Sequence, residues 1–136
     1  MSNADLSRPA RPLHALVRLY RYLASGRPSP CRFQPTCSAY ALEALAELPW
    51  VTSYGPPADR RAGIVSFNLE GIHPHDVAQI LDLQGVAIRA GHHCCQPLMQ
   101  KLGVAATNRA SFYLYTIPEE IDQLVEGLHA VRKVFA

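Results

Sequence analysis

The segment GHHCCQPLM, residues 91–99, carries two cysteines directly after two histidines. We expect a short helix to begin just after the cysteines, and the amides at a helix N-terminus favour an anion. Imidazolium groups, or the guanidinium of Arg89, would favour a thiolate in the same way. Because the thiolate is the reactive form, Cys94 and Cys95 are candidates for nucleophilic chemistry. The alternative from the residues alone is a buried, inert pair of cysteines.

Arg109 is a second candidate for chemistry. It stands at the head of the otherwise apolar run RASFYLY. A planar guanidinium in such a place is suited to bidentate capture of a carboxylate. The alternative is an arginine at the edge of a strand that faces water.

A zinc site is the third chemistry that these residue types suggest, since the chain has 4 cysteines and 6 histidines. Adjacent cysteines, such as Cys94 and Cys95, rarely aim both thiolates at one ion. Cys31 and Cys37 have five residues between them rather than two to four. The spacing argues against zinc, and we predict no metal site. No signal peptide and no apolar run long enough to cross a membrane is found, which favours a reducing cytoplasm and free thiols.

The elements that must position these residues follow from apolar spacing and from Gly and Pro. After a disordered leader at 1–12, the chain is expected to form helices and strands in the order helix 13–24, helix 38–48, strand 51–54, strand 63–69, helix 73–85, strand 86–89, short helix 97–102, strand 108–115 and helix 118–134. From residue 38 onward this order predicts an α/β fold, an α+β two-layer sandwich with helices packed on a small sheet.

Caps and apolar stripes refine the helix predictions. Thr36 or Ser38 can cap the helix that begins near residue 38. Pro118 suits the first turn of the last helix. The apolar stripe of that helix is expected to be buried, and it consists of Ile121, Leu124, Val125, Leu128, Val131 and Val134.

Three blocks occur in order along the chain: RAGIVSFNLEGIHPHDVAQILDLQGVAIRAGHHCCQPLMQKLG, then NRASFYLY, then PEEIDQLVEGL. Together they resemble the C-terminal domain of cysteine desulfurases of the SUF type, which are class V aminotransferase-like enzymes of fold type I that use pyridoxal phosphate. The resemblance runs from about residue 40 to the last residue. It implies that residues 41–136 form the small C-terminal domain of such an enzyme.

The resemblance also implies roles for particular residues. Cys94 would be the nucleophile that takes the sulfur of L-cysteine as a persulfide, for iron–sulfur cluster assembly. Arg109 would bind the substrate carboxylate, Arg89 would shape the substrate pocket, and His93 is counted among the substrate-binding residues. Where the family usually has a small residue this chain has Cys95, which could accept the sulfur as an auxiliary thiol or form a vicinal disulfide.

The family's cofactor lysine and phosphate-binding loop lie in a large N-terminal domain that this sequence does not contain. Its only lysines, Lys101 and Lys133, do not stand in the family's S-x-H-K context. We therefore expect a truncated domain with no pyridoxal phosphate bound and no activity alone. The expected partners are a large domain or desulfurase subunit in trans, a sulfur-acceptor protein, and a second copy of the chain through faces left bare. A non-catalytic persulfide carrier is the alternative.

The head of the chain has its own resemblance and its own charge. LVRLYRYLASGRPSPCRFQPTCSAYALEAL resembles the membrane-protein insertion efficiency factor family on the motif C-R-F-x-P-T-C-S-x-Y-A. This implies a chimera, with the fragment at 13–40 before the desulfurase part. Residues 1–42 hold six arginines and one acid; such a basic segment suits anionic lipid or nucleic acid, and the alternative is a face that is only solvated. We predict weak contact with anionic membranes through 13–25, a cytoplasmic location peripheral to the inner membrane, and no nucleic-acid partner.

Overall fold

The computed structural model describes residue 12, residues 15–17, 19–20 and 23, and residues 35–136. The chain divides into two compact units, Met1–Pro30 and Cys31–Ala136. The described residues of the first unit are helical. The rest of the predicted leader and helix, with most of the CRFQPTC motif including Cys31, lies outside the described residues. None of the helices that the structure describes is long and apolar enough to cross a membrane.

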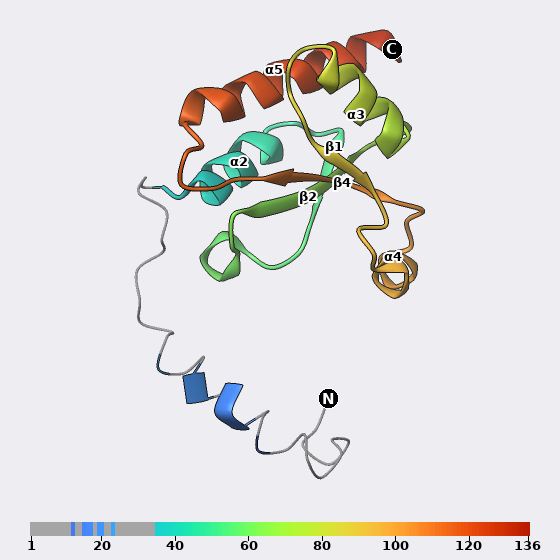
Figure 1. Ribbon diagram of the computed structural model, residues 1–136. Coiled ribbons are helices and arrows are strands. Elements are labelled where there is room, and N and C mark those ends of the chain that lie inside the picture. The colour runs from blue at the N-terminus through green and yellow to red at the C-terminus, as the bar shows by residue number, and fades with distance from the viewer. Residues whose placement is uncertain (1–11, 13–14, 18, 21–22, 24–34) are drawn as a thin grey trace. The chain divides into compact units, whose positions relative to one another are not determined.

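A four-stranded antiparallel sheet is the centre of the second unit (Figure 1). Its strands lie in the order β1-β2-β4-β3. They are β1 (Val51–Tyr54), β2 (Ile64–Leu69), β4 (Thr107–Ser111) and β3 (Arg89–Gly91). All three neighbouring pairs run antiparallel. The two longer strands, β2 and β4, therefore occupy the middle and β3 forms one edge.

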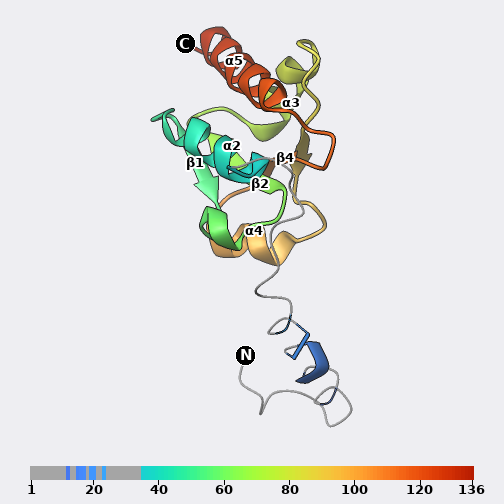
Figure 2. The ribbon, with the colours of Figure 1, turned by 90° about the vertical axis from the view of Figure 1, so that its left-hand side faces the viewer.

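Helices cover the two faces of the sheet unequally. Three helices lie on one face: α2 (Cys37–Ala46), α3 (Pro74–Asp82) and α5 (Pro118–Val134). The short helix α4 (Gln96–Leu102) lies on the opposite face (Figures 1 and 2). A single 3₁₀ turn, η2 (Ala58–Arg60), stands between β1 and β2. The predicted α/β sandwich of helices on a small sheet is confirmed.

The core lies between the sheet and the three helices. Successive side chains of a strand point to opposite faces, and in β2 this places Val65, Phe67 and Leu69 in the core. Leu81 of α3 and Leu128 of α5 meet them there, both fully buried. Burying such a side chain is worth about 1.5–3 kcal/mol relative to leaving it exposed. The other face of β2, with Ser66 and Asn68, is half-buried and turned toward the α4 side.

The helix ends are held by the contacts that the sequence suggests. Thr36 caps α2, where its hydroxyl accepts a hydrogen bond from the Ala39 amide at 3.3 Å. At the start of α5 the Ile117 amide donates to the Glu120 carboxylate at 3.2 Å. Both α2 and α3 are shorter than predicted, since they end at Ala46 and Asp82 rather than at 48 and 85. The predicted burial of Val134 is wrong, because that side chain is 65% exposed at the end of α5.

The strand predicted at 86–89 is wrong over most of its length, because β3 spans Arg89–Gly91. Gly85 takes a left-handed conformation, φ +78°, just after α3. The next amide, of Val86, then donates back to the Leu81 carbonyl at 3.0 Å. Residue 86 is therefore still closing the helix and has no free amide for a sheet. Pairing with β4 begins only at Arg89.

The strand predicted at 108–115 is also wrong at its far end, because β4 stops at Ser111. A turn follows in which Tyr113 and Thr116 bond to each other. The Tyr113 amide donates to the Thr116 hydroxyl at 3.1 Å, and the Thr116 amide donates to the Tyr113 carbonyl at 2.9 Å. These bonds use the backbone groups that a longer strand would need, although the residues are apolar and aromatic.

Candidate active site

The two adjacent cysteines lie in a tight turn between β3 and α4. The amide of Cys95 donates to the carbonyl of His92 at 2.9 Å. The two residues inside this turn, His93 and Cys94, have φ +52° and +59°. Positive φ at both central positions is typical of type I′ turns, which favour Asn and Gly. For other residues the left-handed conformation costs about 1–2 kcal/mol each, so this turn persists only because other contacts hold it.

Both thiols of the turn are accessible. Cys94 and Cys95 are free and exposed, whereas Cys37 is buried in α2. Cys95 is also the residue at which α4 begins, and its side chain makes no capping hydrogen bond. The burial expected under the alternative is therefore contradicted, and the reactivity of the two thiols stays a prediction. Access to reagents is what a nucleophilic thiol requires.

His93 ties the turn to the sheet. Its Nε2 lies 3.0 Å from the carbonyl oxygen and 3.1 Å from the hydroxyl of Thr107. Because a carbonyl oxygen only accepts, Nε2 carries the proton and donates. Nδ1 is then bare, and it is buried without a hydrogen-bond partner among the residues described.

The surroundings of His93 favour its neutral form. Burial is the main cause that lowers the pKa of His93 below its ordinary value of 6.5. The nearby charges of Arg109, Arg89 and His92 lower the pKa further, while the bond to the Thr107 carbonyl partly opposes them. An imidazole that stays neutral near pH 7 keeps Nδ1 available as an acceptor.

Arg109 and Arg89 are neighbours on two adjacent strands of the sheet. Arg109 in β4 is in register with Arg89 in β3 and with Ser66 in β2. By alternation along β4, Arg109 lies on the same face as Thr107, which is the α4 side. The Nε of Arg109 is buried without a partner. Within the described part of the chain neither guanidinium pairs with a carboxylate, so the two form an unneutralised positive pair.

The structure thus brings Arg89, His93 and Arg109 to one side of one sheet edge, and Cys94 follows His93 in the turn at that edge. Their roles as nucleophile and substrate-binding residues stay predictions. What the arrangement offers is an exposed thiol, two cations that suit a carboxylate, and a neutral imidazole with a free acceptor.

Two residues of this site were not found from the sequence. Thr107 is 1% exposed, and its carbonyl oxygen accepts a hydrogen bond from His93. Asn68 bonds across to β4 on both sides of Thr107: its amide donates to the Ala106 carbonyl at 2.9 Å, and its oxygen accepts from the Asn108 amide at 3.3 Å. The only signal for either in the sequence is a polar residue inside an apolar strand.

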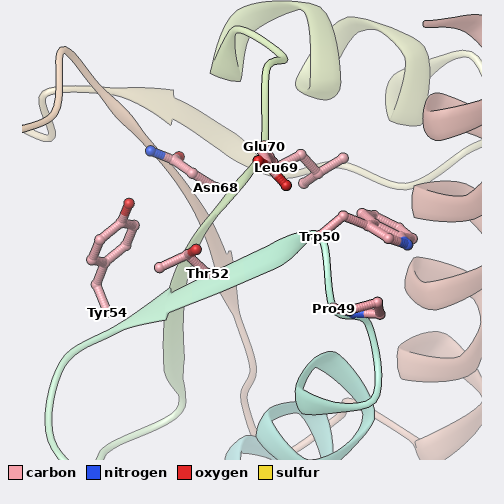
Figure 3. A pocket seen from close by; sticks show the side chains of 7 residues that line it. All are labelled: Pro49, Trp50, Thr52, Tyr54, Asn68, Leu69 and Glu70. Atoms are coloured by element: carbon pink, nitrogen blue, oxygen red, sulfur yellow. The ribbon is translucent and has the colours of Figure 1, made fainter. Parts of the chain in front are cut away.

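A hollow of about 360 Å³ lies over β1 and the end of β2 (Figure 3). Its lining consists of Pro49, Trp50, Thr52, Tyr54, Asn68, Leu69 and Glu70. The lining contains none of the cysteines, and the candidate chemistry therefore lies outside this hollow. No three His, Cys, Asp or Glu side chains gather as a metal site among the residues that the structure describes.

Comparison with known families and proteins follows the same part of the chain. A model of the family described as "Aminotransferase class-V" matches residues 32–124. A protein of Staphylococcus aureus named "Probable cysteine desulfurase" is 46% identical over 122 residues, which are 89% of this chain and 30% of that protein. One of Staphylococcus epidermidis with the same name is 55% identical over 97 residues, 71% of this chain and 24% of that protein.

Solved structures give the same picture. The crystal structure of a cysteine desulfurase from Escherichia coli matches with a TM-score of 0.67 and 33% identity, over 72% of this chain and 24% of that one. The apo structure of a cysteine desulfurase from Thermococcus onnurineus matches with a TM-score of 0.66 and 42% identity, over 71% of this chain and 26% of that one. The chain spans about 30% or less of the length of the relatives that it matches.

Proposed function

Because the chain belongs to the aminotransferase class-V family, we propose that it is the thiol-bearing part of a cysteine desulfurase, the activity for which its relatives are named. In this proposal Cys94 accepts the sulfur of L-cysteine and holds it as a persulfide for iron–sulfur cluster assembly. The observation that carries the proposal is the exposed Cys94 thiol, held in a strained turn that follows β3, the strand whose Arg89 pairs in register with Arg109.

Sulfur acceptance at Cys94 is a displacement at sulfur. The Cys94 thiolate attacks the sulfur that is to be transferred, and a bond forms between that sulfur and Cys94 Sγ. The bond between the sulfur and its donor breaks, and its electron pair leaves with the donor. A sulfur-acceptor protein then repeats the same exchange on the Cys94 persulfide. Cys95, exposed and adjacent, is the auxiliary thiol of this scheme.

The substrate carboxylate is proposed to bind Arg109. Arg109 is only half-buried and forms no ion pair among the described residues, so its guanidinium can take a substrate carboxylate in a bidentate pair. Arg89 stands in register with Arg109 and adds a second positive charge. His93 is the third proposed substrate-binding residue; its Nδ1 is buried, and it would accept from a donor group of the substrate only when the turn opens. The three residues would thereby orient the substrate while Cys94 reacts.

Pyridoxal phosphate supplies the electron sink for breaking the carbon–sulfur bond in this family. The two lysines of the chain do not fit its attachment. Lys101 in α4 and Lys133 in α5 are both exposed, and neither lines the hollow over β1. We propose that the cofactor is provided in trans, by a large domain or a desulfurase subunit that packs on the face of the sheet where α4 lies.

The test has two arms. With L-cysteine and pyridoxal phosphate the isolated chain is expected to release neither alanine nor sulfide, and turnover by the chain alone would refute provision of the cofactor in trans. With a sulfane-sulfur donor, a persulfide-specific reagent is expected to label Cys94. Cys94→Ala should abolish that label, while Cys95→Ala should retain it. A label that survives Cys94→Ala would remove the proposal.

A weak membrane contact is a second proposal, and it is favoured by one observation. The described residues of the first unit are helical, and Leu16, Val17 and Tyr20 among them are 63%, 48% and 66% exposed. An apolar helix face beside arginines suits an anionic lipid surface. Flotation with anionic liposomes, lost in the double variant Arg18→Glu, Arg21→Glu, is the expected result. Flotation unchanged by these charges would count against it.

Self-association is proposed from the bare apolar residues after β4. Tyr113, Leu114, Tyr115 and Ile117 are all at least 40% exposed. Exposed apolar groups of this kind favour contact between copies. Sedimentation at several concentrations is expected to show dimers or larger species, and a monomer at every concentration would contradict this.

A further inference from the structure

We propose that Thr107 is a positioning residue for Cys94, fastening the loop that carries the thiol to β4 on both sides of the nucleophile. The inference rests on the proposed function, because it assigns Thr107 a task in sulfur acceptance at Cys94. It concerns a residue that touches neither the thiol nor the arginines in any recorded contact.

The contacts of Thr107 lie on both sides of Cys94 in the chain. Before the thiol, His93 Nε2 bonds to the Thr107 carbonyl at 3.0 Å and to its hydroxyl at 3.1 Å. After the thiol, the same hydroxyl lies 3.9 Å from the Met99 sulfur in α4. Thr107 and Met99 are 1% and 4% exposed. The loop is therefore pinned at two points to one buried residue.

The directions of these bonds are determined by chemistry. A thioether sulfur has no proton, so the Thr107 hydroxyl donates to Met99 and accepts from His93. The Thr107 carbonyl also accepts from His93. Both oxygens of Thr107 thus require the proton on Nε2, which fixes the tautomer of His93 and leaves Nδ1 bare. Serine can reproduce the hydroxyl, whereas valine keeps the shape of threonine and cannot.

Thr107 is itself held by the neighbouring strand. Asn68 of β2 bonds to the carbonyl of Ala106 and to the amide of Asn108, the residues on either side of Thr107. These side-chain bonds continue the ladder beyond its last register pair, Phe67 with Asn108. Hydrogen bonds thus hold both chain neighbours of Thr107 to β2, while Thr107 itself bonds to His93, the residue before Cys94.

Because the turn is strained, it needs the bonds from Thr107 to His93 and Met99 to keep its conformation. His93 and Cys94 both have left-handed backbones, which non-glycine residues keep only when the structure around them imposes it. Without the Thr107 hydroxyl, the bond to Met99 and one of the two bonds to His93 are lost, and only the Thr107 carbonyl still holds the turn against relaxation toward ordinary φ. Cys94 would then lose the backbone conformation that presents its thiol, while Cys95, with an ordinary φ of −137°, would change less.

The test uses the full chain with sodium tetrasulfide as the sulfur donor. The Cys94 thiolate and a tetrasulfide dianion give the Cys94 persulfide anion and a trisulfide dianion, so that sulfur and charge balance. Mass spectrometry of peptides follows the gain of one sulfur atom at each cysteine separately. Alkylation of Cys95 by iodoacetamide serves as the internal reference, and alkylation of Cys94 in parallel reports access to that thiol.

Thr107→Val is expected to slow sulfur uptake at Cys94 by about five- to tenfold, the equivalent of one strained residue relaxing. The rate of Cys95 alkylation should change less than about twofold, since its backbone carries no comparable strain. Thr107→Ser should restore most of the rate at Cys94. The matched control is Thr52→Val, because Thr52 is an exposed threonine of β1 whose side chain forms no hydrogen bond with the described residues. This variant should behave as the unaltered chain.

Two results would overturn the inference. One is a Thr107→Val chain that melts cooperatively and retains the full Cys94 rate. The other is a loss of the Cys94 uptake rate that Thr107→Ser fails to recover. A double variant, Thr107→Val with His93→Ala, whose loss of rate equals the two single losses combined has the same meaning, since the effects of two bonded residues should not be additive. If the unaltered chain takes up no sulfur at Cys94, the proposed function itself fails, and this is seen before any variant is compared.

Discussion

Replacing Asn108 by valine is expected to stabilise the chain by about 1–2 kcal/mol, although the residue is fully buried in the middle of the sheet. Its side chain is 0% exposed, and neither Nδ2 nor Oδ1 finds a hydrogen-bond partner in the described part of the chain. A buried amide without partners costs about 1–3 kcal/mol. Its backbone amide, bonded to Asn68, is unaffected by the substitution. Valine is of similar size and suits a strand.

Asn68→Val is the matched control, because the same substitution in the adjoining strand should have the opposite effect. The Asn68 side chain makes two hydrogen bonds, to the Ala106 carbonyl and from the Asn108 amide. Removing it leaves both of these backbone groups without a partner. We expect a loss of about 1–2 kcal/mol, reduced by water because Asn68 is only half-buried. The pair of variants thus separates a satisfied amide from an unsatisfied one.

Urea denaturation and thermal melting measure both changes. For a domain of about 100 residues, each 1 kcal/mol moves the melting temperature by about 4–8 °C. Asn108→Val should therefore melt at a higher temperature and Asn68→Val at a lower one. The slope of the unfolding free energy against urea concentration should be unchanged in both. If Asn108→Val loses stability at an unchanged urea dependence, the amide has a partner after all, such as a buried water, and the reasoning is refuted.

Three further predictions concern the contact between α3 and α5 and the turn that contains His93 and Cys94. Gly127→Ala should destabilise the chain by about 1–2 kcal/mol in urea, because a Cβ there would lie 2.5 Å from Leu81 Cδ2 and overpacking outweighs the gain of about 1 kcal/mol in helix propensity; a more stable variant would contradict this. Cys94→Gly should be about 1 kcal/mol more stable than Cys94→Ala in thermal melts, since only glycine relieves a left-handed backbone; equal stabilities would disprove the strain. His93 should titrate by NMR below its ordinary pKa of 6.5. Because the unfolded chain then binds the proton more readily, stability should fall as the pH drops through 6.5 toward the folded-state pKa, and a titration above 6.5 would reverse that sign.

The order of elements and the two-layer fold were predictable because their signals are local. The alternation in β2 buries Val65 and Phe67, and the stripe of α5 buries Leu124 and Leu128, as periodicity implies. Strand ends were not predictable in the same way. VAIR and FYLY have high strand propensity, yet a helix C-terminus that reaches Val86 and a turn closed at Thr116 decide where pairing begins and stops.

The site was predictable only in part. Sequence motifs single out Cys94, Arg89, His93 and Arg109, but the register that sets the two arginines opposite each other comes from strand pairing. Thr107 makes its contacts with residues far away in the sequence, and no local pattern encodes a bond between positions 14 apart. The same is true of the bond from Asn68 to Ala106, whose partners are 38 positions apart. Side chains that support a site are therefore the part that sequence reasoning misses first.

The positive pair at the edge of the sheet has a thermodynamic consequence. Arg89 and Arg109 come into register only when β3 pairs with β4, so folding brings together two like charges that are apart in the unfolded chain. An anion that bridges the two guanidinium groups binds the folded state alone and stabilises it by mass action. The melting temperature should then rise with the concentration of that anion, and the part of the rise that is lost in Arg89→Ala reports the occupancy of the pair, because sulfate also stabilises folded proteins in general.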